Sequence, residues 1–351
     1  MQPYWPATPL VNTATRTLTM DPNQLEGLPR LAFDVAVALL KPLFAFNQYD
    51  SFLYWPFLLA ALGLALLVFL LNRDAGPSSF LRRYFSKAIW GHTSAKADYK
   101  FYYVNGVLFP VVFAPLILSG AWLGAQVHDG FQALFGQHNG LPASAWITTI
   151  YTLAFFLVYD FGRYLAHYLQ HRIDFLWHFH KVHHSAEVLT PFTAFRAHPV
   201  DLVIMATFPA AATGIINGIF NYWTGGSTGL YLFFGLHILI FIYNLVGNLR
   251  HTHVWLSYGP FLNRIFISPA QHQIHHSIEQ HHWGRNMGFA LAFWDQLFGT
   301  LYVPHEHERF EIGLGDGTEG HYHGVIGMYW RPVRELFMRN DKSHGFTRDD
   351  G

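Results

Sequence analysis

The stretch FLWHFHKVHHS (residues 175–185) holds four histidines in eleven positions, and HKVHH (residues 180–184) within it has the form H-x-x-H-H. The same form recurs as HQIHH at residues 272–276. Three imidazoles within five residues are difficult to bury unless something binds them, because an unpaired polar group in an apolar interior costs free energy. Two copies of this form in one chain therefore predict a metal-binding protein.

Two shorter histidine clusters accompany these segments. His167-Tyr-Leu-Gln-His171 places two histidines four residues apart, so both fall on one face of a helix and can reach one metal ion. His251-Thr-His253 follows an apolar run. The four clusters together predict two metal ions held within a bundle of helices. A solvated, histidine-rich surface is the alternative, but it does not explain the spacing.

The composition indicates a membrane protein. Apolar residues make up 51% of the 351 residues and charged residues 13%, about half the ~25% that is typical of soluble domains. Lysine plus arginine and aspartate plus glutamate both number 22, so no net charge attracts nucleic acid. The chain has no cysteine, which excludes disulfides, thiolate zinc sites and cysteine-ligated iron–sulfur clusters. Any metal ligands are therefore histidines or carboxylates.

Five apolar runs are candidate membrane spans, because about 20 apolar residues cross the hydrocarbon layer as a helix. They cover residues 52–71, 107–127, 146–159 (extended by 141–145), 202–223 and 230–246. The run 31–46 carries two charges and is interpreted as an interfacial helix or as part of a first span.

The basic residues orient these spans. The connection 72–106 carries six lysines and arginines, whereas 128–145 and 224–229 carry none. The positive-inside rule therefore places 72–106 in the cytoplasm. Counting from there, residues 160–200 and the region after 247 also face the cytoplasm. All the dense histidine clusters then face one compartment, as a shared site requires.

These observations predict an all-α fold, a multi-pass transmembrane helical bundle with a cytosolic helical cap that holds a histidine-rich dimetal site. We expect residues 1–50 to form an N-terminal arm and an interfacial helix. Residues 51–303 are expected to form the membrane-embedded domain that carries the site, and 304–351 a polar cytosolic tail. One integral-membrane domain is assigned because the spans and the histidine clusters interleave.

Ordered motifs carry a family resemblance. They are DFGRYLAH (160–167), FLWHFHKVHHS (175–185), RAHP (196–199), HT (251–252), GP (259–260), SP (268–269), HQIHHS (272–277), NMG (286–288) and WDQLFGT (294–300). In order and spacing, they resemble the fatty acid hydroxylase / sterol desaturase superfamily from about residue 100 to residue 303. This family comprises integral-membrane, histidine-ligated di-iron oxygenases that hydroxylate or desaturate lipids, sterols or carotenoids. The resemblance implies that 51–303 is a catalytic domain of this kind.

Carried over position by position, the resemblance implies nine metal ligands. They are His167, His171, His180, His183, His184, His251, His272, His275 and His276. Some members use a further histidine near the third cluster, which here is His253 or His237. His237 shares a predicted helix face with Asn244 and His251, but a lone histidine on an apolar span is equally well explained as a hydrogen-bonded core residue.

Three positions depart from the family pattern. Tyr168 and His178 stand where arginine is often found, and the usual H-S-N segment reads His251-Thr-His253. None of these changes removes a ligand, but each leaves the identity of the substrate open.

Residues that orient the ligands are expected nearby, because a ligating histidine usually donates its other N–H to a carboxylate or carbonyl. The candidates are Asp160, Asn286, Asp295 and His198, with Asp201 and Glu187 also close to the clusters in sequence. For each carboxylate, a solvated surface role is an equally good interpretation. His281 and His282 are interpreted as solvated or as supporting residues.

The implied cofactor is a pair of iron ions with O₂ as co-substrate, because the family is oxidative and splitting O₂ requires a metal that changes valence. Imidazole also binds zinc, so a purified sample can carry zinc instead. The predicted reaction is hydroxylation, at an unactivated C–H bond, of a lipid or sterol-like substrate that enters from the bilayer. Desaturation at the same site is the alternative.

The chain lacks cysteine and a fused cytochrome b5 motif. A separate electron donor is therefore expected, of the cytochrome b5, ferredoxin or reductase type. A non-catalytic protein for membrane metal binding or transport is the alternative from a different functional class. Transporter sites lie near the bilayer midplane, whereas these clusters lie beyond the predicted span ends, which argues against transport.

Overall fold

The computed structural model describes residues 27–71 and 77–337, so residues 1–26 of the expected N-terminal arm lie outside the described residues. This part of the chain is mainly helical. Its elements are α1 (Gly27–Leu40), η3 (Lys41–Asn47), α2 (Trp55–Leu71), α3 (Pro77–Tyr84), α4 (Lys87–Trp90), α5 (Thr93–Leu108), η4 (Phe109–Phe113), η5 (Ala114–Leu116), α6 (Gly120–Phe135), α7 (Ala145–Arg172), α8 (Asp174–His184), η6 (Pro191–Phe195), α9 (Pro199–Thr224), β1 (Leu232–Phe233), β2 (Leu236–His237), α10 (Ile238–Gly247), η7 (Asn248–His251), α11 (Gly259–Leu262), α12 (Pro269–His275), η8 (Gln280–His282), α13 (Phe293–Leu297), η9 (Glu319–Tyr322) and α14 (Val325–Phe337).

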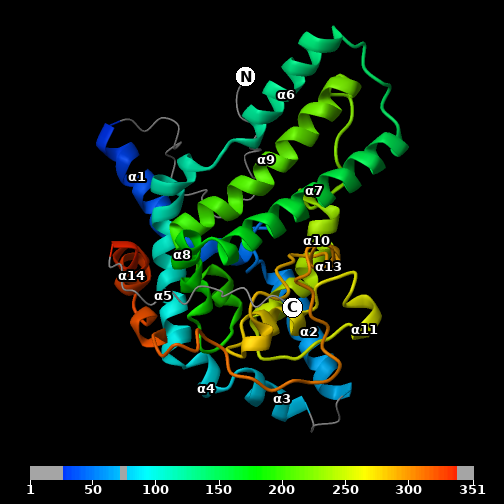
Figure 1. Ribbon diagram of the computed structural model, residues 1–351. Helices are drawn as coiled ribbons and strands as arrows, with labels where there is room; N and C mark the ends of the chain where they lie inside the picture. The colour runs from blue at the N-terminus through cyan, green and yellow to red at the C-terminus, as the bar shows by residue number, and fades with distance from the viewer. Residues whose placement is uncertain (1–26, 72–76, 338–351) are drawn as a thin grey trace.

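Three helical stretches of the described chain are long and apolar enough to cross a membrane. They are Thr93–Phe135, which joins α5, η4, η5 and α6, together with α7 and α9. Helix α9 packs along both α6 and α7, and these helices project together from the rest of the protein (Figure 1). Large apolar side chains on α7, such as Trp146 and Leu153, are exposed, which is the pattern of a helix surrounded by lipid. Three of the predicted spans fall within these stretches.

The first and last predicted spans differ from these three. Helix α2 is apolar but has 17 residues, and it packs against α10. The prediction of one helical span at 230–246 is wrong, because β1 and β2 form a short antiparallel hairpin and α10 has 10 residues, about 15 Å of helix. The chain turns at Phe234 and Gly235, which have φ angles of 48° and 79°. Helical φ angles are negative, and glycine adopts a positive φ without strain.

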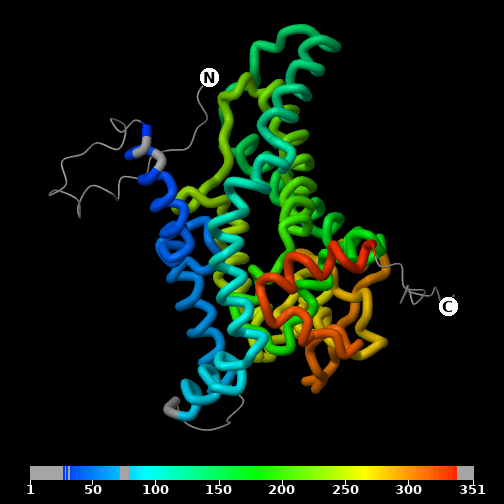
Figure 2. Tube along the Cα trace, turned by 90° about the vertical axis from the view of Figure 1, so that its left-hand side faces the viewer, coloured from blue at the N-terminus to red at the C-terminus, as the bar shows by residue number. Residues whose placement is uncertain are grey.

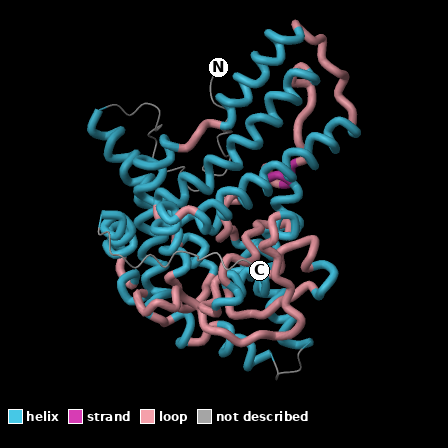
Figure 3. The backbone as a smooth tube through the Cα atoms, in the orientation of Figure 1, coloured by secondary structure: helices cyan, strands magenta, loops and turns pink. Residues whose placement is uncertain are grey.

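Short helices and loops gather at the end of the molecule away from the projecting ends of α6, α7 and α9 (Figure 3). Helix α14 packs against α8 and α5 and lies on the outside of this region (Figure 2). Met328 of α14 and Tyr322 just before it are fully buried. Much of the segment expected to be a polar tail is therefore folded onto α8, and 338–351 lie outside the described residues.

A buried ion pair ties these parts together. Arg196 and Asp98 are fully buried, and Nη1 of Arg196 lies 2.7 Å from Oδ1 of Asp98. Arg196 also donates hydrogen bonds to the carbonyl oxygens of Val182 on α8 and Tyr322 on η9. One guanidinium thus joins α5, α8 and the segment that leads into α14, and it holds α8 in place.

Candidate metal centre

Nine histidines from four separate segments meet in two adjacent groups. The first group is His167, His171, His180, His184 and His275, and the second group is His183, His251, His272 and His276. In each group, one nitrogen from each ring lies within 4.8 Å of those of the other rings, and every side chain is buried. The structure therefore brings together all nine residues that the sequence analysis implied as ligands.

Helical periodicity divides the two H-x-x-H-H segments between the groups. On α8, His180 and His184 are four residues apart and face the first group, whereas His183 faces the second. At the end of α12, His272 and His276 face the second group and His275 faces the first. The two segments share one sequence form but have opposite assignments, so each joins both groups. His184 and His276 stack across the boundary, with ring centroids 4.6 Å apart.

The ring nitrogens converge closely. The Nε2 atoms of His167 and His180 are 3.1 Å apart. In the second group, Nε2 of His251 lies 3.0 Å from Nε2 of His272 and 3.3 Å from Nε2 of His183. Two imidazoles can share one proton, but several converging nitrogens cannot all satisfy one another. Nitrogens bound about 2.0–2.1 Å from one metal ion lie at separations of roughly this size.

Several of these ring nitrogens are buried and have no hydrogen-bond partner among the described residues. They are Nε2 of His171, His184 and His275 in the first group, and Nδ1 of His183 and His276 in the second. A buried polar atom left unpaired costs about 1–3 kcal/mol. Three such atoms in the first group would be unfavourable without a bound ion, so the residues present fit a metal.

Burial keeps these imidazoles neutral. Burial, together with the nearby His180, lowers the pKa of His183 to about 3. Burial also lowers the pKa of His275 to about 3, although the hydrogen bond to the Arg285 carbonyl opposes this change. The pKa values of His184, His251, His272 and His276 are also lowered, in each case mainly by burial. A neutral imidazole keeps the lone pair that a metal requires.

Three outward-facing ring nitrogens have partners that orient the rings. Nδ1 of His167 lies 2.7 Å from the carbonyl oxygen of Met287, and Nδ1 of His275 lies 2.8 Å from that of Arg285. Nδ1 of His180 lies 3.1 Å from Oδ2 of the buried Asp201. Each ring can donate its Nδ1–H outward and leave Nε2 directed inward, which is the usual arrangement of a metal-binding histidine.

Arg250 is a functional candidate that the sequence analysis missed. Its Nη2 atom lies 2.6 Å from Nδ1 of His272, and its other contacts include the carbonyl oxygens of Phe289 and Gly288. A guanidinium only donates, so Nδ1 of His272 accepts here, unlike Nδ1 of His167, His180 and His275. A neutral His272 ring then carries its proton on Nε2, and this proton must leave before Nε2 can bind a metal. The only sequence signal was the position of Arg250 directly before His251.

The predicted supporting residues act mainly on backbone. Asp160 accepts hydrogen bonds from the backbone N–H groups of Ala290 and Leu291. Asp295 accepts from those of Met287 and Gly288, and burial raises its pKa to about 6. Asp295 therefore acts through the Met287 peptide, whose carbonyl oxygen contacts a ring of the first group.

The other two predicted supporting residues do not contact either group. Asn286 donates to the Gln271 carbonyl oxygen and accepts from the backbone N–H of Tyr302. His198 caps the N-terminus of α9, and its Nε2 atom lies 3.2 Å from the carbonyl oxygen of Tyr329. Asp201, which the sequence placed near the clusters without a partner, is the carboxylate that contacts a ring directly.

Neither candidate for a tenth ligand lies in the two groups. His237 caps α10, its Nε2 atom lies 3.1 Å from the carbonyl oxygen of Thr152, and its ring stacks on Phe155. It precedes α10 and His251 follows it on η7, so the two do not share one helix as expected. His253 is exposed and packs against Tyr84.

Two further histidines have a carboxylate neighbour. His281 and His282 form a separate cluster with Glu308, and Nε2 of His282 lies 3.0 Å from Oε2 of Glu308. His281 is exposed and His282 is buried. This pairing joins η8 to the loop that follows α13.

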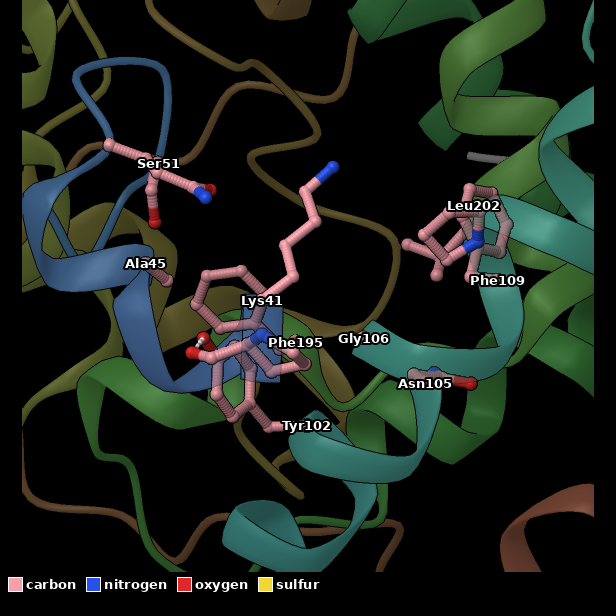
Figure 4. Close-up of a pocket in the computed structure, with 12 residues that line it drawn as sticks. Lys41, Ala45, Ser51, Tyr102, Asn105, Gly106, Phe109, Phe195 and Leu202 are labelled. Carbon is pink, nitrogen blue, oxygen red and sulfur yellow. Dashed lines mark hydrogen bonds between the residues drawn. The ribbon is translucent and has the colours of Figure 1, made fainter. Parts of the chain in front are cut away.

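A small apolar cavity lies on the side of α9 and α5 that faces η3. Its volume is about 230 Å³, and its walls come from Lys41–Ser51, the end of α5, η4, Phe195 and Leu202 (Figure 4). Leu202 directly follows Asp201, the residue that contacts His180. The cavity and the Asp201 contact thus lie at the same N-terminal turn of α9.

Comparisons with known proteins agree with the motifs. Residues 152–300 match the fatty acid hydroxylase family, and this segment contains all nine histidines of the two groups. The family resemblance predicted from the motifs is confirmed by this match. The chain is 28% identical over 186 residues to an ornithine lipid hydroxylase of Rhizobium tropici, which covers 52% of this chain and 51% of the relative.

Other relatives differ in their named activities. An alkylglycerol monooxygenase of Xenopus tropicalis is 29% identical over 232 residues, which cover 59% of this chain and 48% of the relative. A Delta(7)-sterol 5(6)-desaturase of Gibberella zeae is 28% identical over 150 residues, 43% of this chain and 42% of the relative. The chain thus spans about half the length of these relatives. No solved structure matches it significantly.

Proposed function

Starting from a segment that matches the fatty acid hydroxylase family, we propose that the chain is an O₂-dependent membrane monooxygenase with two iron ions. Its substrate is a lipid or a sterol-like molecule, hydroxylated at an unactivated C–H bond. The observation that carries this proposal is the convergence of nine buried histidines in adjacent groups of five and four. Each group supplies enough nitrogens for one ion, and contact between the groups allows the two ions to act together.

When bound, the pair of iron ions supplies the activation of O₂ and the cleavage of the C–H bond. The protein holds the ions through the inward-facing nitrogens and orients the rings through the Met287 and Arg285 carbonyls and the Asp201 carboxylate. Burial of the rings excludes bulk water from the groups. Forming one alcohol and one water from O₂ also consumes two electrons and two protons, so we propose a separate electron donor.

We further propose that the histidine groups face the cytoplasm. The basic residues Arg82, Arg83 and Lys87 lie on α3 and α4, which connect α2 to α5 at the end of the molecule away from the projecting helices (Figure 1). The positive-inside rule favours the cytoplasm for such a connection. His167 and His171 lie in the last two turns of α7, and the other rings lie on helices too short to span.

Isotope labelling tests the proposed reaction. The purified full-length protein, loaded with iron, is given a lipid extract, a reductant and ¹⁸O₂, and the lipid products are analysed by mass spectrometry. We expect a product that gains one ¹⁸O atom. Loss of two hydrogens without oxygen gain would indicate the desaturase alternative. This alternative is tested because one of the relatives is named as a sterol desaturase. Product oxygen derived only from water would overturn the proposal.

Single histidine substitutions test the ligand assignment. His183→Ala removes a nitrogen from the second group and His275→Ala one from the first, so each variant is expected to lose bound metal and activity while still inserting in the membrane. His321→Ala, at an exposed position outside both groups, is the matched control. Full metal content and full activity in the first two variants would contradict the assignment. Metal transport by reconstituted protein without turnover would favour the transport alternative.

A further inference from the structure

The cavity beside α5 and α9 has one charged side chain in an otherwise apolar and neutral wall. Pro42, Ala45, Phe109, Pro110, Phe195 and Leu202 supply apolar atoms. No aspartate or glutamate is among the lining residues, and Lys41 is the only basic one. Figure 4 shows the Lys41 side chain extending between Ser51 on one side and Leu202 and Phe109 on the other. The cavity is therefore apolar, with an ammonium group at its edge.

Three other polar side chains of this wall already have partners inside the protein. The Tyr102 hydroxyl donates to the carbonyl oxygen of Pro42 at 2.6 Å. Asn105 donates to the Ala197 carbonyl oxygen at 2.9 Å and accepts from the Tyr329 hydroxyl. The Ser51 hydroxyl oxygen accepts from the backbone N–H of Leu53. These three side chains stabilise the wall, and their hydrogen bonds are made within the protein.

Lys41 differs from them because no carboxylate of residues 27–71 or 77–337 lies within ion-pair distance of it. Lys41 is exposed and is the first residue of η3. The neighbouring side chains Leu39, Leu43 and Phe44 are exposed and apolar. Such an apolar surface is expected to lie in lipid. A lysine beside an apolar surface extends its ammonium group toward the polar layer of the membrane, where an anionic group can pair with it.

We propose that this cavity binds the substrate and that Lys41 binds its anionic headgroup. The ligand class is a single-chain lipid with a phosphate or carboxylate head, whose chain enters the apolar cavity toward Leu202. The inference rests on the proposed lipid oxidation and adds the class of substrate to it. The ammonium group pairs with the head, and the chain lies in the cavity against Leu202, one residue along α9 from Asp201.

Binding of two matched lipids tests this proposal. The probes are a radiolabelled acylglycerol phosphate and the neutral acylglycerol with the same saturated chain. Each is bound to immobilised full-length protein in a neutral detergent, which carries no surface charge of its own. We expect the protein to bind the phosphate lipid about 10-fold more tightly, because a hydrogen-bonded ion pair at a partly apolar site adds roughly this much.

Variants of Lys41 separate headgroup recognition from a structural role. Lys41→Ala should remove the preference and leave binding of the neutral lipid unchanged, whereas Lys41→Arg should keep it. Lys100→Ala, which changes an exposed lysine on α5 outside the cavity wall, is the matched control. Ala45→Phe fills the cavity and should weaken both lipids, with the helical content by circular dichroism showing whether the variant is folded.

Three results would overturn the proposal. The first is equal binding of the two lipids by the unmodified protein, and the second is equal weakening of both by Lys41→Ala. The third is full competition by inorganic phosphate at the concentration of the lipid probe, which would show that the site binds a free anion. Binding is measured without turnover and repeated with His183→Ala protein. A failure of lipid oxidation therefore leaves the result on headgroup recognition intact.

Discussion

Asp201 should control the affinity of one metal ion and not of the other. Its Oδ2 atom lies 3.1 Å from Nδ1 of His180, and its Oδ1 atom accepts a hydrogen bond of 2.8 Å from Gln170. The Asp201 side chain is 3% exposed, so no solvent screens its charge. Asp201→Asn keeps the shape of the side chain but removes the charge that holds the His180 ring. Only the first group contains His180.

The size of the effect follows from the role of such partners. Replacing a residue that orients a ligating histidine typically lowers metal affinity 10–100-fold, which corresponds to about 1.4–2.7 kcal/mol. We therefore expect the unmodified protein to bind two metal ions per chain. In Asp201→Asn, we expect the metal affinity of the first group to be lower. The second group, whose rings make no hydrogen bond to Asp201, should bind as before.

A competition titration measures this prediction. Metal-free full-length protein is titrated with zinc against a chromophoric chelator, and the bound metal is counted by mass spectrometry. Asp174→Asn removes an exposed carboxylate from the first turn of α8 and serves as the control. Unchanged affinity at both sites in Asp201→Asn would refute the reasoning. Equal weakening of both sites would also refute it, because the effect would then lie in the fold.

Three further predictions concern stability. Arg196→Met leaves a buried carboxylate without its partner, so the free energy of unfolding should fall by about 3–5 kcal/mol, measured as a lower Tm in detergent, while an unchanged Tm would contradict the buried ion pair. Burial alone would raise the pKa of Glu335, but its hydrogen bonds, including one from Lys181, lower the pKa to about 2. The folded pKa thus lies below the unfolded value of about 4.5, and the stability gained from Glu335 is present above pH 4.5 and lost as the pH falls toward 2. Glu335→Gln should lack this acid-dependent part, roughly 1–3 kcal/mol after allowance for partial exposure, in an unfolding series from pH 7 to pH 3. In Gly162→Ala, the added methyl group would lie 2.6 Å from the Cα atom of Pro209. The variant should separate α7 from α9 and lower Tm, and an unchanged Tm would show that the helices are not in contact there.

The histidine clusters and the apolar spans could be predicted from the sequence, because the patterns that identify them are local. The four-residue spacing of His167 and His171 is a property of a single helix turn, and it holds in α7. The apolar runs within α7 and α9 likewise need no distant partner to be visible. The prediction of one helix at 230–246 was wrong because apolar composition contains no information on φ angles. The turn at Phe234 and Gly235 interrupts this run.

Contacts between distant segments were less accessible from the sequence. Asp201 was noted near the clusters, but its contact with His180 depends on how α9 packs against α8. The carbonyls of Met287 and Arg285 offer no side-chain signal at all, because every residue type has a carbonyl. In the sequence, nothing distinguishes Arg250 from other basic residues, and its contact with His272 is visible only in the tertiary structure.

The sequence by itself determined which histidines gather and that the helices around them are apolar. The resemblance of the motifs to a known family implies the nine histidines, and runs of about 20 apolar residues identify the long helices. Only the tertiary structure decided how the nine histidines divide into five and four. The two H-x-x-H-H segments are identical in form, yet α8 gives two rings to the first group and α12 gives one. The physical reason is that each helix presents its faces to different neighbours, and these neighbours are set by packing between segments about 90 residues apart in the chain.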